Sequence, residues 1–375
     1  MSKTKECQLL TSKSQSQGDH MTENIMISGE TLSGKTMVAI AIASKLRERG
    51  ISVGYFKPVG KKSFERSHDY DVDVDEDALV MKDVLDLSTD LGCICPVVRT
   101  QSSYDEFLRI GHDELLTKIQ NCYKKAAKDK EYVLLEGTKA PWHLLHVGLS
   151  TPQLAKDFNC RVICLVNFPD VSAIDDVLLQ RDLFRQHGIE SISVVLNMVP
   201  PMLKSAVTED IIPFLKEKGV DFCGVVYKHR ELFSPSLGEI KRALDGEMLI
   251  GEEKKDILID QFQIGSMGYQ HALKWFRRAK DKAVIAGGDR SDICLAALET
   301  DTNLLILTGG LGPDIRTISK AKEEGVPIMM TAHDTYTTGK IVDDLVGTVT
   351  AENKKKIRAV EKIIGENINL ECIGL

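Results

Sequence analysis

A glycine-rich turn that ends in a lysine and a threonine is the part of the sequence best suited to chemistry. Residues 29–36 read GETLSGKT and match the pattern G-x-x-x-x-G-K-[ST] at every position. The glycines let successive backbone N–H groups face one anion, and a helix that begins at Lys35 adds its positive end. In such a phosphate-binding loop (P-loop) the lysine reaches the terminal phosphates of a nucleotide, and the next hydroxyl binds Mg²⁺. We therefore expect Mg²⁺ and ATP as cofactors, Lys35 as a catalytic group, Thr36 as a metal ligand, and a phosphate site made of Gly29, Glu30, Thr31, Leu32, Ser33, Gly34, Lys35 and Thr36.

Two further charged residues are expected near this turn. Glu136 directly follows the apolar run 132–135, so it ends a strand at the edge where open α/β sheets bind ligands. Its carboxylate is a suitable ligand for Mg²⁺. Lys57 also follows a strand and precedes Pro58. A phosphate or substrate contact and an ordinary surface lysine are equally good interpretations of Lys57. The acidic run 69–77 (DYDVDVDED) is typical of a solvated loop, and by itself it singles out no aspartate.

Alternating strands and helices position these residues. A strand at Ile25–Ile27 leads into the turn, a helix follows over Lys35–Arg49, and the next strand is Ser52–Phe56. Short apolar strands separated by helices predict a parallel sheet with helices on both faces. The fold class is therefore α/β, with a P-loop NTPase-type sheet in a first domain at residues 23–236 and a flexible arm at residues 1–22 before it. The remaining strands of this domain are expected at 131–135, 161–167, 193–197 and 222–227.

The second half of the chain predicts a smaller α/β domain, residues 237–375, that includes a C-terminal helix. The segment 246–256 is charged and is expected to be a connection, and strands are expected at 283–286, 304–307 and 327–330. A polar turn follows each strand, which gives a candidate edge for an unknown small-molecule ligand. Arg290 could hold a carboxylate or phosphate there, or Asp289 could cap a helix while Arg290 pairs with a surface acid. The candidate edge comprises Asp289, Arg290, Thr308, Gly309, Gly310, His333 and Asp334.

Composition limits the classes of function. The chain has 375 residues with a formal charge of −7, 43% hydrophobic and 27% charged residues, which excludes wholesale disorder. The acidic balance argues against a nucleic-acid partner, and no apolar stretch reaches the roughly 20 residues of a membrane span. The first twenty residues lack the apolar core of a signal peptide. Nine cysteines without a signal indicate free thiols in a reducing compartment. We expect a cytoplasmic protein with no membrane partner.

Five short motifs in order resemble a known family. SGETLSGKT, GYFKPVG, DEDALVMKDVL, YVLLEGT and VVLNMVP occur as in dethiobiotin-synthetase-like P-loop proteins, and more specifically as in the N-terminal domain of long phosphate acetyltransferases. In the second half, KAVIAGGDRSDICLAALET and the segment from LLILTGG to TAHDT resemble the DRTGG domain that follows it there. The resemblance covers roughly residues 24–345.

The resemblance implies roles at matching positions. Lys57 matches the lysine that contacts the transferred phosphate and the substrate. Asp77 and Glu136 would complete the metal shell with Thr36. Asn197 matches the side chain that recognises adenine, a role suited to an amide, which both donates and accepts hydrogen bonds. The resemblance also implies a homodimer.

The departures from the family concern the substrate. Glu136-Gly137 is followed by TKAP in place of the glycines that hold the diamine substrate, and Gly60-Lys61 lacks the expected serine. The loop before Gly34 is one residue shorter than in those synthetases. These changes leave the nucleotide half intact and argue against biotin synthesis. Acetyl transfer is not expected either, since the chain ends at Leu375 without the phosphotransacetylase catalytic domain.

Three functional hypotheses remain open. The first is an ATP-binding regulatory or sensor protein, with or without slow hydrolysis, whose DRTGG-like domain transmits the state to a partner. The second is an ATP-dependent ligase or cyclo-ligase acting on a small carboxylate or amine. The third is a scaffold whose nucleotide stabilises the fold. The altered sequence after Glu136 favours the first hypothesis, and the presence of Lys57 favours the second.

Overall fold

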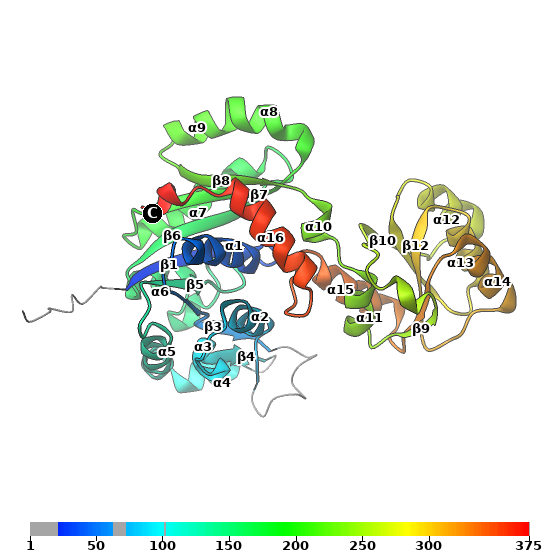
Figure 1. Cartoon of the computed structure of the whole chain (residues 1–375), viewed down its shortest axis with the longest axis horizontal. Helices are drawn as coiled ribbons and strands as arrows, with labels where there is room; N and C mark the ends of the chain where they lie inside the picture. The colour runs from blue at the N-terminus through cyan, green and yellow to red at the C-terminus, as the bar shows by residue number, and fades with distance from the viewer. Residues whose placement is uncertain (1–21, 63–72, 101–102, 375) are drawn as a thin grey trace, which may run out of the picture.

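The computed structural model describes residues 22–62, 73–100 and 103–374. The expected arm at residues 1–22 lies outside this range except for its last residue. Two units with mostly parallel sheets follow each other along the chain, a larger one with the P-loop and a smaller one that forms a separate lobe (Figure 1). This is the predicted fold class, a mostly parallel P-loop sheet with helices on both faces and a second α/β unit.

The larger unit is built on a six-stranded, all-parallel sheet. Its strands are apolar along most of their length because both faces are covered. Alternate side chains of β1 point to opposite faces of the sheet and pack in different hydrophobic cores. Met26 packs on one face, and Ile25 and Ile27 pack on the other. In spatial order the strands are β2 (Val53–Phe56), β5 (Tyr132–Glu136), β1 (Glu23–Gly29), β6 (Cys160–Asn167), β7 (Ile192–Val199) and β8 (Asp221–Tyr227).

Helices cover the two faces of this sheet. One face carries α1 (Lys35–Glu48) and α2 (Glu76–Leu85). The helix α1 ends where Gly50 adopts a left-handed conformation (φ 78°), as the glycine at that position predicts. The other face carries α5 (His112–Ala126), α6 (Thr151–Asp157) and α7 (Ala173–Gln186). Shorter elements complete the unit: the strand pair β3 (Val59–Lys61) and β4 (Val97–Arg99), and the helices α3 (Leu91–Ile94), α4 (Ser103–Ile110), α8 (Lys204–Ala206), α9 (Ile212–Glu217) and α10 (Arg230–Phe233).

The smaller unit has a five-stranded sheet. Its spatial order is β10 (Gln261–Ile264), β11 (Lys282–Gly287), β12 (Thr302–Thr308), β13 (Ile328–Met330) and β9 (Glu247–Ile250). The prediction that residues 246–256 are only a connection was wrong, because β9 lies in this segment and pairs antiparallel with β13. An edge strand that alternates exposed and half-buried positions carries little hydrophobic signal. The helices are α11 (Leu237–Ala243), α12 (Tyr269–Phe276), α13 (Ser291–Leu298), α14 (Ile315–Glu324) and α15 (Thr335–Leu345).

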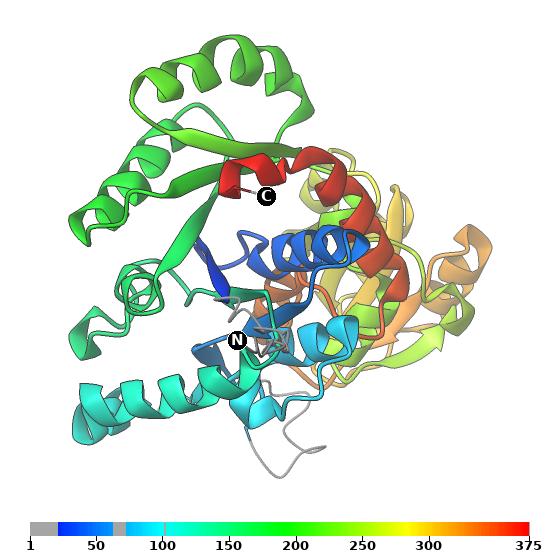
Figure 2. The same ribbon diagram turned by 60° about the vertical axis from the view of Figure 1, so that its left-hand side comes forward.

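The C-terminal helix returns to the larger unit. The sequence placed α16 (Lys354–Asn367) with the second domain, but Ile357, Val360 and Ile364 pack in the core that contains α1. Figures 1 and 2 both show α16 alongside α1. This side of α1 is therefore also covered, which explains why the helix is apolar nearly all round.

Polar and covalent contacts hold this returning segment. The Lys45 ammonium on α1 donates to the carbonyls of Gly365 and Ile368, each at 2.7 Å. Cys223 of β8 forms a disulfide with Cys372 of the final turn, η5 (Leu370–Ile373). The expectation of free thiols was wrong for this pair. Their separation of 149 residues in sequence hides the contact.

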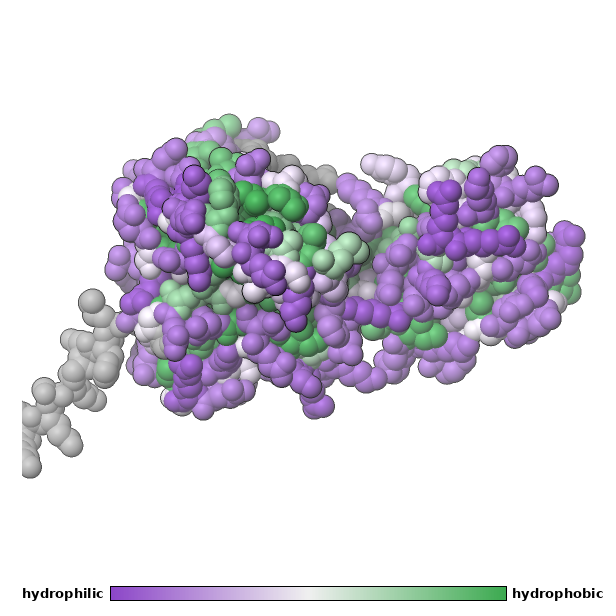
Figure 3. All heavy atoms as spheres, turned by 90° about the horizontal axis from the view of Figure 1, so that it is seen from above, coloured by the Kyte–Doolittle hydropathy of each residue, from purple (hydrophilic) through white to green (hydrophobic). Residues whose placement is uncertain are grey.

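The surface is mainly hydrophilic on the face shown in Figure 3, with scattered hydrophobic residues on both lobes. Within the described part of the chain, no helix has the length and apolar character required to cross a lipid bilayer.

Candidate functional site

The P-loop joins the end of β1 to the start of α1. Gly34 has φ 85° and Leu32 has φ 59°, so the turn uses left-handed conformations at both positions. A Cβ at Gly29 would lie 2.4 Å from Ser33 Oγ, which explains why a glycine is required there. The Lys35 ammonium bends back and donates to the carbonyls of Gly29 (3.1 Å) and Glu30 (2.7 Å).

Lys35 is a buried cation. Its side chain is 9% exposed, and burial lowers its pKa while the Glu136 carboxylate acts in the opposite direction. The two carbonyls that accept its hydrogen bonds are neutral. A phosphate group in the loop would add the negative charge that a buried ammonium favours.

Lys57 lies beside the P-loop among three carboxylates. Its ammonium contacts Asp75 Oδ1 at 3.0 Å, Glu136 Oε1 at 3.3 Å and a carboxylate oxygen of Asp77. Lys57 is 8% exposed, while Asp75 and Glu136 are 3% and 1% exposed. Burial alone would lower the pKa of Lys57, but the three carboxylates together raise it well above its usual range. We refer to Lys57, Asp75, Asp77 and Glu136 as the carboxylate cage.

Glu136 connects this cage to the P-loop helix. It ends β5, whose register places it beside Ile27 of β1. The Thr36 hydroxyl donates to Glu136 Oε1 at 3.4 Å, and the Tyr55 hydroxyl donates to Oε2 at 2.8 Å. Burial, which outweighs the attraction of Lys57, raises the pKa of Glu136 to about 7. The carboxylate therefore favours a further positive charge near it.

The two aspartates of the cage come from the start of α2. Asp75 caps this helix by accepting from the N–H of Ala78 at 3.1 Å, and it also accepts from the N–H of Lys61 at 2.7 Å. Burial opposes ionisation of Asp77, but Lys57 and Thr36 lower its pKa. Sequence reasoning missed Asp75. An aspartate directly before a helical pattern is a capping signal that could have distinguished it from the rest of the acidic run.

Of the predicted metal ligands Thr36, Asp77 and Glu136, the two carboxylates contact the Lys57 ammonium, and Thr36 bonds to Glu136. Among the described residues, no group of three or more histidine, cysteine, aspartate or glutamate side chains is arranged to hold a metal ion. Mg²⁺ in nucleotide sites takes only one or two carboxylates, together with phosphate oxygens and water. The oxygen donors of this edge suit such a partial shell.

Asn197 lies beneath the P-loop. Its side chain is 1% exposed, and its amide nitrogen donates to the Ser33 carbonyl at 2.7 Å. In this arrangement the amide nitrogen is already engaged and supports the loop. The adenine contact that the resemblance implies stays a prediction.

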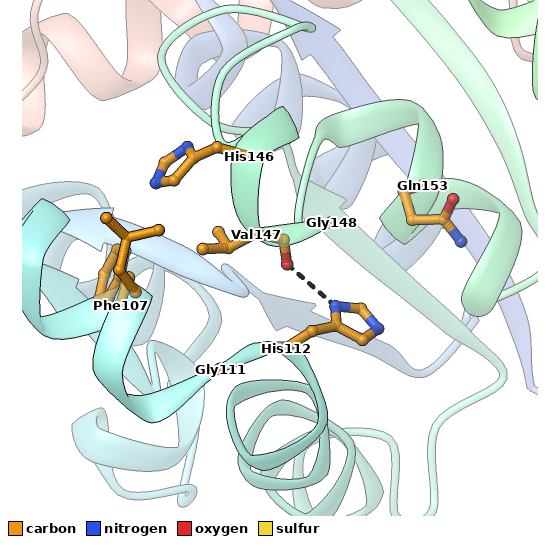
Figure 4. Close-up of a pocket in the computed structure, with 8 residues that line it drawn as sticks. Phe107, Gly111, His112, His146, Val147, Gly148 and Gln153 are labelled. Carbon is orange, nitrogen blue, oxygen red and sulfur yellow. Dashed lines mark hydrogen bonds between the residues drawn. The ribbon is translucent and has the colours of Figure 1, made fainter.

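The loop after Glu136 leads from the cage to a pocket. Lys139 accepts a hydrogen bond at its carbonyl from the Thr31 hydroxyl (3.3 Å), so the loop touches the P-loop. Further along, the chain reaches a cavity of about 490 Å³ lined by Phe107, Gly111, His112, His146, Val147, Gly148 and Gln153 (Figure 4). The His112 ring shares a hydrogen bond with the Val147 carbonyl at 2.9 Å across this cavity. None of the P-loop residues lines it.

The candidate edge of the smaller sheet has a different character. Arg290 pairs with Asp292 at 3.0 Å, with side chains 40% and 47% exposed, as the surface-pair alternative predicts. The Thr308 hydroxyl bonds to that of Thr335 at 2.8 Å, and Asp334 caps α15. Asp289 is exposed and does not cap α13, whose N-cap is Arg290. Gly309 and Gly310 form a left-handed turn after β12, and His333 accepts at its carbonyl from the Gly309 N–H at 2.8 Å. The polar groups here largely satisfy one another.

Comparison with known proteins agrees with the two-unit architecture. The family model of the AAA domain matches residues 23–235, more than half of the chain, and that of the DRTGG domain matches residues 239–345. A phosphate acetyltransferase of Nitratidesulfovibrio vulgaris is 25% identical over 94% of this chain and 51% of its own length. An ATP-dependent dethiobiotin synthetase of Methanocaldococcus jannaschii is 26% identical over 58% of this chain and its entire length.

A solved structure of the CBS and DRTGG domains of a Clostridium perfringens pyrophosphatase covers 47% of this chain and 74% of its own, with 23% identity and a TM-score of 0.28, which is too low to bear on function. The chain spans about half the length of the phosphate acetyltransferases that it matches. The resemblance inferred from the sequence motifs is confirmed. The chain belongs to the AAA-domain family of P-loop proteins, and a DRTGG domain follows its P-loop domain.

Proposed function

We propose that this protein binds ATP with Mg²⁺ at the P-loop and that the DRTGG domain communicates the bound state to a partner. The observation that carries the proposal is the buried charge at the P-loop edge. Within residues 22–62, 73–100 and 103–374, no carboxylate is in direct contact with Lys35, and the cage reaches Thr36 through Glu136. Buried charge is costly unless it is compensated. A site that retains it is well suited to a charged ligand.

We expect the residues of the edge to have three roles. Lys35 and the N–H groups of residues 29–36 would bind the phosphates. Thr36, Asp77 and Glu136 would hold Mg²⁺, which supplies positive charge against the phosphate oxygens. Without ligand, Lys57 would neutralise the carboxylates of the cage. When Mg²⁺ neutralises Asp77 and Glu136 instead, the Lys57 ammonium would be available to a phosphate.

A continuous physical connection supports communication between the units. The P-loop lies at one end of α1, and Lys45 near the other end holds the C-terminal part of α16. At the start of α16, the Asn353 amide donates to Glu239 Oε1 of α11 at 3.0 Å. A displacement of α1 would therefore reach the smaller unit through one helix. Accordingly, we propose a division in which residues 354–374 accompany residues 23–236, and residues 237–353 form the DRTGG unit.

The ligase hypothesis has two observations in its favour. The cavity beside the loop that follows Glu136 could hold a second substrate, and Lys57 is present at the cage. A regulatory protein does not need either feature. The family also leads us to propose a homodimer, which sedimentation analysis can test.

Thermal unfolding tests nucleotide binding. ATP with Mg²⁺ at about 100 times its Kd would stabilise the native state by about 2.7 kcal/mol. This corresponds to a rise in Tm of several degrees. Lys35→Ala should abolish the rise, while Lys282→Met should retain it, because the buried Lys282 lies in the smaller unit and donates to the carbonyls of Ala279 and Asp301. No rise for the unaltered chain with ATP or GTP would refute the proposal.

ATP turnover separates the two functions. Tight binding with negligible turnover, unchanged by a panel of small carboxylic acids and amines, supports the regulatory role. ADP release that one of these compounds stimulates, and that Lys57→Ala removes, supports the ligase.

A further inference from the structure

The free thiols of the chain differ in their exposure. Within the described ranges six cysteines are free, and four of them are buried: Cys95, Cys160, Cys164 and Cys294. Burial raises the pKa of each of these four thiols, which disfavours the reactive thiolate. Cys93 and Cys122, in contrast, are partly exposed. A dissolved oxidant therefore has access to these two thiols and not to the other four.

The two partly exposed thiols contact each other. Cys93 lies on α3 and Cys122 on α5, and the two helices are neighbours (Figure 1). The Cys122 thiol donates to Cys93 Sγ at 3.5 Å. A disulfide has an S–S distance of about 2.0 Å, so closing the pair requires the two sulfur atoms to approach by about 1.5 Å. The surroundings of α3 leave room for this movement, because a Cβ at the exposed Gly92 would meet no heavy atom within 4 Å.

The hydrogen bond gives the two sulfur atoms different roles. Burial and the hydrogen bond to Cys93 raise the pKa of Cys122, and together they outweigh the opposing effect of Lys125 and Lys118 on the same helix. Cys122 therefore keeps its proton, and its S–H group faces the sulfur of Cys93. In this arrangement Cys93 is the sulfur that attacks an oxidant, and Cys122 is placed to react with the product.

We propose that Cys93 and Cys122 form a reversible redox site, which an oxidant of the peroxide class closes to a disulfide. The Cys93 thiolate attacks one oxygen of hydrogen peroxide, the O–O bond breaks, and a sulfenic acid and a hydroxide ion result. The Cys122 sulfur then attacks the Cys93 sulfur, and the sulfenic hydroxyl leaves as water with the Cys122 proton. The two sulfur atoms lose two electrons in total, and the peroxide gains them. A dithiol reductant reverses the reaction by thiol–disulfide exchange.

The new bond would also act on the segment that carries Lys57. The helix α3 ends at Ile94, whose carbonyl accepts the backbone N–H of Lys57 at 2.9 Å. A disulfide between Cys93 and Cys122 would tie this acceptor to α5 and restrict local opening around the Lys57 N–H. This effect does not depend on the function proposed for the P-loop.

Peptide mapping by mass spectrometry tests the bond. The full-length chain carries Cys7→Ser, because Cys7 lies outside the described residues and is to be kept out of the reaction. After treatment with hydrogen peroxide we expect a linked Cys93–Cys122 peptide, the loss of two free thiols per chain, and recovery of both thiols in dithiothreitol. In Cys122→Ser the Cys93 sulfenic acid should accumulate and react with dimedone, while Cys160→Ser, which removes a buried thiol, should form the link as the parent does. Absence of the link in the folded parent, or fragmentation that assigns the link to Cys95, would overturn the proposal.

Hydrogen exchange tests the effect on the Lys57 segment. The Lys57 amide should exchange several-fold more slowly in the oxidised than in the reduced protein, because its acceptor is then tied to α5. Cys122→Ser should remove this difference, and the amides of β12 in the smaller unit should exchange equally in both states. Equal exchange at Lys57 in the linked and reduced proteins would refute the connection to the cage. Neither result changes the melting test with ATP, so this proposal and the proposed function fail separately.

Discussion

The two sheets of this chain carry glycine turns at their carboxyl ends, but they treat charge differently there. At the P-loop edge, Lys35, Lys57, Asp75 and Glu136 are buried. At the edge of the smaller sheet, Asp289 is exposed, and Arg290 and Asp292 pair at the surface. Folding gains little from buried charge, whereas a surface pair costs almost nothing. The difference teaches that the position of charge, more than the presence of a glycine turn, marks the stronger candidate for binding an anion.

The largest expected effect comes from removing the central ammonium of the cage. Lys57→Met leaves Asp75 and Glu136 buried without their cation and should lower the free energy of unfolding by about 3–5 kcal/mol. Arg290→Ala should lower it by less than about 1 kcal/mol. Urea unfolding of both variants measures the contrast. Equal losses would remove the distinction between the two edges.

The second-largest expected effect comes from removing the disulfide that holds the C-terminal segment on the larger unit. Cys372→Ser removes the link to Cys223 and should lower the stability of the larger unit by about 2–4 kcal/mol. Trp142 lies in the larger unit and Trp275 in the smaller one, so variants with one tryptophan follow each unit separately. We expect the Trp142 transition to move to lower urea concentration and the Trp275 transition to move less. An unchanged Trp142 transition would show that the disulfide does not stabilise this unit.

Glu136→Gln should separate stability from binding. Because the pKa of Glu136 rises from 4.5 to about 7 on folding, the folded state binds more protons between these values, and stability falls as pH rises through this range. A glutamine cannot ionise, so the variant should melt a few degrees above the unaltered chain at pH 8 and should show no such gain at pH 4. It should also lose the dependence of ATP binding on Mg²⁺. A lower Tm at pH 8 together with intact Mg²⁺ dependence would contradict both roles of Glu136.

The smallest effect concerns His143, which lies in the loop that follows Glu136. Burial and the nearby Arg99 lower the pKa of His143 to about 4, so the unfolded chain takes up a proton first as pH falls. Stability from this group is present above about pH 6.5 and is lost toward pH 4. His143→Gln should reduce the slope of Tm against pH in that interval, while His187→Gln, at the C-terminal end of α7, serves as the control. Equal slopes in all three proteins would exclude this contribution.

Much of the sheet edge could be predicted from the sequence because its signals are local. Glycine spacing located the P-loop, and an acid after an apolar run located Glu136 at the end of β5. The family motifs distinguished Asp77 from its acidic neighbours. The structure brings Lys35, Lys57, Asp77 and Glu136 to one edge, while their functional roles stay predictions.

Long-range contacts could not be predicted in the same way. The packing of α16 on α1 and the pairing of Cys223 with Cys372 join segments far apart in the chain. The edge strand β9 was missed because only one side of it faces another strand. Asp75 was overlooked since a run of acids hides the one that caps a helix. No local pattern could have indicated the contact of Cys93 with Cys122, which arises where α3 meets α5.

Titration calorimetry of ATP into the full chain tests the central claim most directly. With Mg²⁺ present, we expect saturable binding that weakens at least tenfold in EDTA and is lost in Lys35→Ala, while Arg290→Ala binds as the unaltered chain does. Binding that persists in Lys35→Ala, or that disappears in Arg290→Ala, would contradict the assignment of the nucleotide to the edge with buried charge.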